Sequence, residues 1–155
     1  MQIMLKPSPR LLKTLINLWP PFLGAGIKVR HIASDWKQVD VRLRLGVSNR
    51  NYVGVHFGGS LYAMTDPFFM LMLMQSLGPD YLVWDKAASI EYHKPGKGDV
   101  TARFRLDEAQ LHDIRQRTAD GNKYLPELAV EIRDESGDIV ATVLKTLYIR
   151  RKKGR

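Results

Sequence analysis

The chain has 155 residues, no cysteine and a formal net charge of +8 at pH 7. This length fits one domain, and a sequence without cysteine excludes disulfides, a thiol nucleophile and thiolate zinc sites. Residues 1–50 sum to +7 and residues 150–155 to +5, whereas residues 51–149 sum to −4. The positive excess therefore lies at the ends of the chain, and we expect no nucleic-acid partner for its mildly acidic middle.

The first predicted element is an amphipathic helix that begins after Ser8, with Pro9 in its first turn, and ends before Pro20. Its apolar stripe consists of Leu11, Leu12, Leu15, Ile16, Leu18 and Trp19. Packing of this stripe on the domain or on a dimer partner is the first interpretation, and peripheral contact with a membrane surface is the second. No small-residue cleavage site follows the helix, so we expect a cytoplasmic protein.

Two strands over residues 28–33 and 36–47 precede the stretch that stands out in this sequence, residues 49–77. The stretch begins with a polar, glycine-rich segment that ends in Gly58 and Gly59, and Ser60 is a candidate N-cap for a helix that is apolar nearly all round as far as residue 77. Asp66 is the only acid in this helix, and Pro67 predicts a kink beside it. Such a helix is typical of the buried centre of a soluble domain, with a membrane span as the alternative.

The rest of the chain predicts mostly antiparallel strands, over residues 81–84, 87–93, 100–106, 128–132 and 139–149. Residues 107–118 predict a short surface helix or an excursion, and turns are expected at residues 95–98 and 135–138. The apolar middle of the last strand places it inside the sheet. The order of elements favours an α+β fold in which an antiparallel sheet wraps around one long buried helix.

One motif carries a resemblance to a known family. The pattern N-x-x-G-x-x-F-G-G-x6-D runs from Asn51 to Asp66 and resembles the hotdog-fold acyl-CoA thioesterases of the phenylacetate-pathway-like branch. Phe57 stands where that branch has a histidine, and His56 lies one residue earlier. The turns at residues 92–99 and 133–141 also look like recurrent hotdog turns. The whole chain is most similar to an uncharacterised hotdog family that carries a domain-of-unknown-function label.

The resemblance implies a hotdog fold with about five or six strands, plus the N-terminal helix. Residues 28–150 would form the single hotdog domain, with the helix and a linker at residues 1–27 packed on it. Residues 151–155 would form a basic tail.

The resemblance also implies hydrolysis of an acyl thioester, with Asp66 as general base or nucleophile and the Gly59 backbone N–H as oxyanion donor. The two residues are seven positions apart, which is about 10 Å along one helix. A homodimer, in which the glycine of one subunit faces the acid of the other, resolves this distance, and a dimer of dimers is a further possibility. Coenzyme A would enter only as part of the substrate, with no other cofactor.

Further substrate-binding candidates follow from the motif and its neighbours. They are Asn51, His56, Phe57, Gly58, Ser60 and Thr65. Phe57 is expected to wall the acyl pocket, and Lys94 and Lys97 are candidates for the phosphates of coenzyme A.

Several alternatives stay open. Asp66 could be a buried acid capped by the hydroxyl of Thr65, of Tyr62 or of a residue from a partner chain, and Asn51 and His56 could stabilise the glycine loop. The whole protein could bind an acyl chain or lipid without hydrolysing it, or act as a hydratase. A metal site is not expected, because the four histidines show no ligand spacing.

Overall fold

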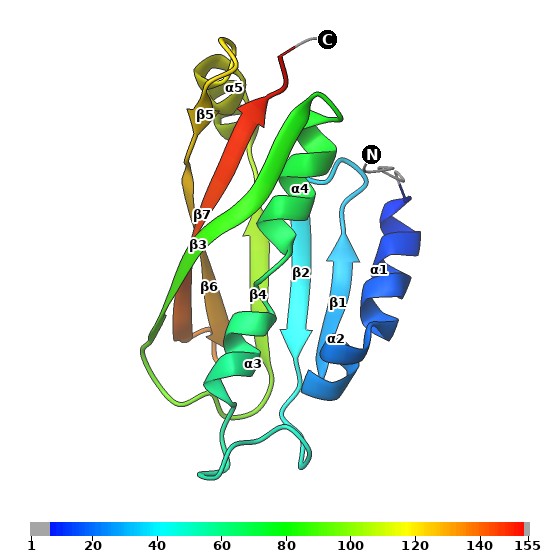
Figure 1. Ribbon diagram of the computed structural model, residues 1–155. Helices are drawn as coiled ribbons and strands as arrows, with labels where there is room; N and C mark the ends of the chain where they lie inside the picture. Colours follow the sequence, from blue (N-terminus) through cyan, green and yellow to red (C-terminus); the bar gives the residue numbers. More distant parts are fainter. Residues whose placement is uncertain (1–6, 154–155) are drawn as a thin grey trace.

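The computed structural model describes residues 7–153 as an antiparallel sheet curved around two short helices (Figure 1). Seven strands form the sheet: β1 (Ile27–Ile32), β2 (Gln38–Leu43), β3 (Tyr81–Tyr92), β4 (Val100–Arg105), β5 (Lys123–Tyr124), β6 (Glu127–Asp134) and β7 (Ile139–Arg151). Five helices accompany it: α1 (Pro9–Leu18), α2 (Pro20–Ala25), α3 (Gly58–Ala63), α4 (Phe68–Leu77) and α5 (Glu108–Arg117). The sheet is slightly larger than the five or six strands expected.

The strands lie in the order β1-β2-β4-β6-β7-β3, and β5 pairs with β7. β7 therefore lies inside the sheet, as its apolar middle predicted. The two strands expected over residues 81–84 and 87–93 are one strand, β3, with a register irregularity between Asp85 and Ala87.

The C-terminal strand is longer than predicted, because β7 continues to Arg151. The backbone N–H of Lys152 then donates to the carbonyl of Asp80 at 2.8 Å. The predicted basic tail is thus ordered at its start by pairing with the beginning of β3. Residues 154–155 of that tail lie outside the described residues.

The core lies between the concave face of the sheet and α4. Alternation along β2 buries Val39, Val41 and Leu43, as the sequence pattern predicts. From α4, Phe68 and Phe69 each place their ring centroid 5.1 Å from that of Phe104 on β4. These aromatic contacts hold the central helices against the sheet.

The predicted single central helix is in fact two. α3 begins at Gly58 with Phe57 as its N-cap, so Ser60 is not the cap, and the helix ends at Ala63. Pro67 has no N–H to donate and its ring crowds the preceding turn. The backbone instead makes tight turns, with the N–H of Thr65 bonded to the Tyr62 carbonyl at 2.9 Å, before α4 begins. Asp66 lies in this interruption.

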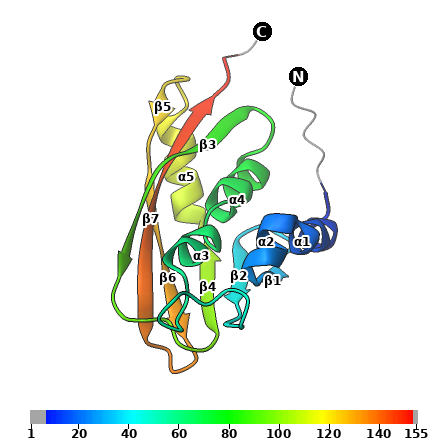
Figure 2. The ribbon, with the colours of Figure 1, turned by 60° about the horizontal axis from the view of Figure 1, so that its bottom comes forward.

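The N-terminal helix covers one edge of the sheet, beside β1 (Figures 1 and 2). Ser8 caps α1 as expected, accepting from the N–H of Leu11. Only part of the predicted apolar stripe packs on the domain, however, because Leu11, Leu15 and Leu18 are exposed. Residues 1–6 of the predicted N-terminal segment lie outside the described residues. Among residues 7–153, no helix is long and apolar enough to cross a membrane.

Candidate functional site

The loop before α3 is held in shape by Asn51. Its side-chain carbonyl accepts hydrogen bonds from the N–H groups of Val53 and Val55, both at 3.1 Å, and its amide nitrogen donates to the His56 carbonyl at 3.3 Å. Asn51 thus stabilises the glycine loop in this structure. Its predicted contact with substrate stays a prediction.

His56 is buried beneath the same loop, with 3% of its surface exposed. Its Nε2 lies 2.7 Å from the Gly98 carbonyl, which can only accept, so Nε2 carries the proton. Burial lowers the pKa of His56, partly opposed by the hydrogen bond to Gly98 and the charge of Asp99. The ring is therefore neutral near pH 7 and ties the loop to the turn before β4.

Gly58 and Gly59 begin α3 where two aromatic side chains approach the backbone closely. A Cβ on Gly58 would lie 2.9 Å from the Tyr92 hydroxyl, which donates to the Gly58 carbonyl at 3.1 Å. A Cβ on Gly59 would lie 2.5 Å from the ring of Phe57, and that ring is 58% exposed. The N–H of Gly59 has no hydrogen-bond partner within residues 7–153, because the first intrahelical bonds come from residues 60 and 61. It remains a free donor at the surface.

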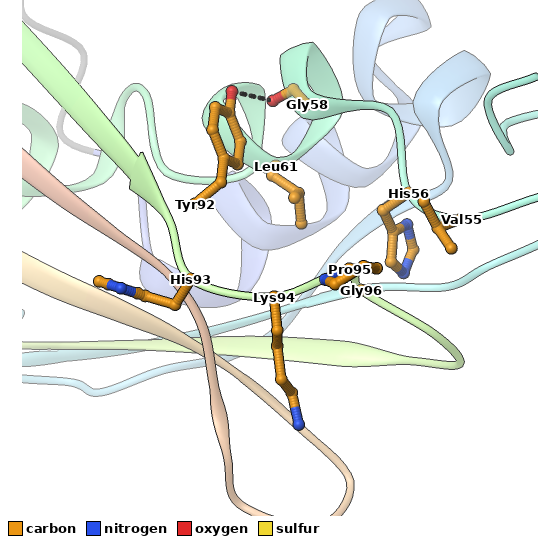
Figure 3. Close-up of a pocket in the computed structure, with 9 residues that line it drawn as sticks. All are labelled: Val55, His56, Gly58, Leu61, Tyr92, His93, Lys94, Pro95 and Gly96. Atoms are coloured by element: carbon orange, nitrogen blue, oxygen red, sulfur yellow. Dashed lines mark hydrogen bonds between the residues drawn. The ribbon is translucent and has the colours of Figure 1, made fainter. Parts of the chain in front are cut away.

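A pocket of about 460 Å³ opens between the start of α3 and the end of β3 (Figure 3). Leu61, His56 and Tyr92 line it, together with the backbone of residues 93–96. Figure 3 shows the side chains of His93 and Lys94 pointing away from it. The pocket is mostly apolar, and Asp66 is not among the residues that line it.

The remaining predicted site residues are spread around this pocket. Asn51, Phe57 and Ser60 line a second hollow of about 290 Å³. Thr65 is fully buried, and its hydroxyl donates to the Tyr62 carbonyl at 2.7 Å. Lys94, a candidate for coenzyme A phosphates, has its ammonium 2.6 Å from carboxylates of both Asp134 and Asp138.

Asp66 belongs to a charged cluster on the concave face of the sheet. Its Oδ1 accepts a hydrogen bond from the Tyr62 hydroxyl at 2.9 Å and another from the Lys145 ammonium at 3.1 Å. Lys145 also lies 3.2 Å from Oδ2 of Asp85 on β3. The Lys145 side chain is completely buried, whereas that of Asp66 is 51% exposed. Among the described residues only Oδ1 of Asp66 has partners, so Oδ2 is free.

The electrostatics of the cluster follow from one ammonium between two carboxylates. Burial opposes the charged form of Lys145, but Asp66 and Asp85 outweigh it and raise the pKa of the ammonium. Burial raises the pKa of Asp85, opposed by Lys145, and Oδ1 of Asp85 has no hydrogen-bond partner among the described residues. Burial and the hydrogen bond to Asp66 raise the pKa of the Tyr62 hydroxyl, which stays protonated as a donor. The cluster thus holds Oδ1 of Asp66 with two donors and, within residues 7–153, leaves Oδ2 without a partner on a half-exposed side chain.

Lys145 and Asp85 are the members that sequence reasoning missed. A signal was present, because Val143, Lys145 and Leu147 share one face of a strand whose other members on that face are buried. A lysine at an inward-facing position needs a carboxylate partner. Which carboxylate it meets depends on the pairing of β3 with β7, and the sequence pattern alone does not give that pairing.

No group of three or more His, Asp or Glu side chains within residues 7–153 is placed to hold a metal ion. The structure thus has an oriented carboxylate at Asp66, a free backbone donor at Gly59 and an apolar pocket that neither residue lines. A carboxylate can act as a base and a backbone N–H can stabilise an oxyanion where both meet one carbonyl group.

Comparisons with solved structures establish the fold. A probable thioesterase of unknown function from Pseudomonas aeruginosa is 20% identical, with a TM-score of 0.78 over 92% of this chain and 95% of that one. A thioesterase from Haemophilus influenzae is 15% identical, with a TM-score of 0.68 over 97% and 96% of the two chains. A mutant of the phenylacetic acid degradation protein PaaI from Thermus thermophilus is 24% identical, with a TM-score of 0.58 over 84% and 98%. The expected hotdog fold is therefore confirmed.

No curated protein matches this sequence. A family model does, and it spans residues 9–149, from the start of α1 almost to the end of β7. It thus includes the N-terminal helix as well as the sheet and the Asp66 cluster. The chain belongs to the hotdog family described as Domain of unknown function (DUF4442).

Proposed function

We propose that the protein hydrolyses a thioester of coenzyme A or of an acyl carrier, with Asp66 as general base or nucleophile. The observation that carries this proposal is the state of the Asp66 carboxylate. Two donors hold Oδ1, while Oδ2 is free on a half-exposed side chain. An oriented carboxylate with one free oxygen can take a proton from water or attack a carbonyl carbon. The thioesterase names of the structural relatives agree with this chemistry.

In the proposed reaction, Oδ2 of Asp66 accepts a proton from a water molecule as the water oxygen bonds to the thioester carbonyl carbon. The Gly59 N–H of the partner subunit donates to the oxygen that becomes negative. The carbon–sulfur bond then breaks, and the leaving sulfur takes the proton that Oδ2 of Asp66 accepted, so that a carboxylic acid and a thiol form and the Asp66 carboxylate is regenerated. Lys145 and Tyr62 orient the carboxylate through their hydrogen bonds to Oδ1, which is a positioning role rather than a catalytic one.

A site shared between two subunits suits the separation of the two groups. Gly59 lies in the first turn of α3 and Asp66 seven residues later, beyond the end of that helix, and neither residue lines the pocket at the start of α3.

The proposed dimer would form through β3. This twelve-residue strand ends the sheet on one side, and residues 86–89 in its middle are exposed. A long, open edge strand of small residues is a ready template for pairing with a second copy. Coenzyme A enters this proposal only as part of the substrate, and a cytoplasmic location stays a prediction.

The test replaces Asp66 by Asn and measures free thiol released from thioesters of graded chain length. We expect turnover to fall by about 100-fold or more, because the amide can neither accept the proton nor attack. Asp80→Asn, an exposed acid outside the cluster, is the matched control and should keep full activity. Full activity in Asp66→Asn would exclude the proposed role of this residue.

A second candidate function is acyl binding without hydrolysis. It is favoured by Phe57, which places an exposed ring without a donor where the related thioesterases have a histidine. It predicts that long acyl thioesters raise the melting temperature while no thiol appears. Release of thiol that depends on Asp66 would exclude it.

A further inference from the structure

The outer side of the N-terminal helices carries a row of exposed apolar side chains that no described element covers. The exposed fractions are 52% for Leu11, 53% for Leu15, 63% for Leu18, 50% for Trp19 and 57% for Leu23. The first four are spaced i, i+4, i+7 and i+8, so they share one face of α1 and its end. Leu23, four residues after Trp19, lies in the next helix, α2. We call these five residues the exposed apolar row.

The opposite face of α1 is fixed to the domain, so the row cannot turn inward. Ile16 packs against the core. The side chain of Asn17 donates to the Val29 carbonyl at 3.0 Å and accepts from the Val29 N–H at 2.7 Å. These two bonds satisfy the backbone N–H and carbonyl of Val29 on the free edge of β1 and fix the rotation of the helix. The row is therefore a permanent feature of the surface.

The segment of sequence that carries the row has charge of one sign. Residues 1–33 contain five Lys or Arg and no Asp or Glu. Of these, Arg10 on α1 and both Lys28 and Arg30 on the neighbouring strand are exposed. An occupant that complements this surface needs apolar groups to receive the row and negative charge to meet the basic residues.

A second copy of this chain does not meet that requirement. A twofold contact pairs the same surface patch with itself, so it would place two basic, acid-free segments against each other. An anionic bilayer meets both needs at once, since its headgroups attract Lys and Arg and its acyl boundary accepts Leu and Trp. Trp19, at the end of the helix, is of the type that gathers at membrane–water interfaces.

We propose that the exposed apolar row docks this protein on the surface of an anionic lipid bilayer, with α1 and α2 lying in the interface plane. The row lies beside β1, at the opposite end of the strand order from β3 (Figure 1). Docking there leaves the β3 edge free. The interaction does not depend on whether the protein hydrolyses thioesters.

The experiment uses the full chain and two kinds of vesicle, pure phosphatidylcholine and phosphatidylcholine containing roughly one-third phosphatidylglycerol. Sedimentation of protein with the vesicles measures binding, with and without added salt. We expect binding to the anionic vesicles only, weakened by salt because the Lys and Arg contacts are screened. The variant Arg10→Gln should bind the anionic vesicles more weakly than the native chain at the same salt concentration.

The double variant Leu15→Gln/Leu18→Gln tests the apolar contribution. Glutamine keeps helix propensity close to that of leucine, and both side chains are exposed, so circular dichroism should be unchanged. Binding should fall by about 100-fold or more, because two leucine side chains no longer enter the acyl boundary. Val47→Gln, at a side chain 82% exposed in the loop after β2 and outside the row, is the matched control and should bind normally.

Two results would overturn the proposal. One is no binding to anionic vesicles, including the case in which the row instead drives concentration-dependent self-association that the double variant abolishes. The other is vesicle binding that the double variant leaves intact, which would assign it to another surface.

Discussion

Lys145 shows how strongly one residue can depend on its neighbours. Its side chain is fully buried, and a buried ammonium is tolerated only when carboxylates lie close to it. Asp66 and Asp85 supply them at 3.1 and 3.2 Å, from the central helices and from β3. The same contacts that stabilise the lysine orient the proposed catalytic carboxylate. A change at Lys145 should therefore affect both the stability of the fold and the orientation of the proposed catalytic carboxylate.

Replacing Lys145 by Met should lower the free energy of unfolding by about 2–4 kcal/mol, because the partly buried Asp85 loses its counter-ion. This loss of stability is smaller than for a fully buried ion pair, because Asp66 is half-exposed and its charge is partly screened by water. Urea unfolding measures the change. Lys86→Met, at an exposed neighbouring position on β3, is the control and should change stability by less than about 0.5 kcal/mol. Equal effects in the two variants would mean that the ion pairs do not stabilise the fold.

His56 should make stability depend on pH in the weakly acidic range. Burial lowers its pKa below the usual 6.5. As the pH falls through 6.5, the unfolded chain binds the proton before the folded chain does, so the free energy of unfolding decreases; above 6.5 this contribution is fully present. The slope should stay below about 1.4 kcal/mol per pH unit, the limit for one proton.

The measurement is urea unfolding at several pH values between about 8 and 5. His56→Gln can still donate to the Gly98 carbonyl but cannot titrate, so its slope in this range should be smaller than that of the native chain. His112→Gln, at an exposed position on α5, is the control. A slope unchanged in His56→Gln would show that other groups cause the pH dependence.

The sequence predicted part of this site at the residue scale. The motif picked out Asp66 and Gly59, and Tyr62 was foreseen as a hydroxyl partner of the acid, which the 2.9 Å hydrogen bond confirms. Lys145 and Asp85 were missed because they reach Asp66 through strand pairing, which periodicity does not specify. A motif defines neighbours along the chain, whereas a charge cluster needs neighbours across the sheet.

At the scale of elements, alternation predicted the strands well and the central helix less well. Pro67 was expected to kink one helix, but α3 and α4 are separated by four residues. Helix propensity favours continuation, and the missing N–H of proline decides against it. The N-terminal helix was correctly placed, yet its stripe divides into a packed face and an exposed one. An apolar stripe in a sequence does not show which of its side chains are buried against the domain and which remain exposed.

The junction between α2 and β1 gives a prediction at this scale. Gly26 ends α2 in the left-handed conformation, with φ of 78°, and a Cβ there would lie 2.5 Å from the amide nitrogen of Asn49. That amide donates to the carbonyls of Ala25 and Arg44, so it cannot easily move aside. Gly26→Ala should therefore destabilise the protein by about 2–3 kcal/mol.

Gly24→Ala is the matched control, since Gly24 lies in α2 with nothing near its Cβ position. It should be neutral or stabilise the protein by up to about 1 kcal/mol. Chemical unfolding of both variants gives the comparison. Similar stabilities for the two would mean that Asn49 adapts and that the junction is not strained by a side chain.

At the scale of the whole molecule, the two edges of the sheet differ. Asn17 and α1 satisfy the β1 edge, which protects it from pairing with another chain. Within residues 7–153, β3 ends the sheet with no strand paired at its outer edge, and it carries Asp85 of the Asp66 cluster. A second subunit paired at β3 would therefore approach the proposed catalytic acid. This asymmetry makes the two-subunit site testable by mixing inactive subunits.

Two variants that each remove a different group should restore activity when they share a dimer. Asp66→Asn removes the proposed base, and Gly59→Pro removes the free N–H at a first-turn position of α3 where proline is tolerated. Each alone should be inactive in thiol release. A mixed dimer has one site lacking both groups and one site with both intact. Refolding the variants together at equal concentration should give about one quarter of native activity, because about half of the dimers are mixed and each has one working site.

The control is the same mixture without refolding or exchange of subunits, which should stay inactive. Circular dichroism of Gly59→Pro must match that of the native chain, because Phe57 has to move away from the new side chain. If the refolded mixture stays inactive although mixed dimers are present, both groups act within one chain, and the 7-residue spacing between Gly59 and Asp66 is bridged by the fold itself. If it recovers, the base of one subunit serves the oxyanion donor of the other, and the open β3 edge is the element that brings them together.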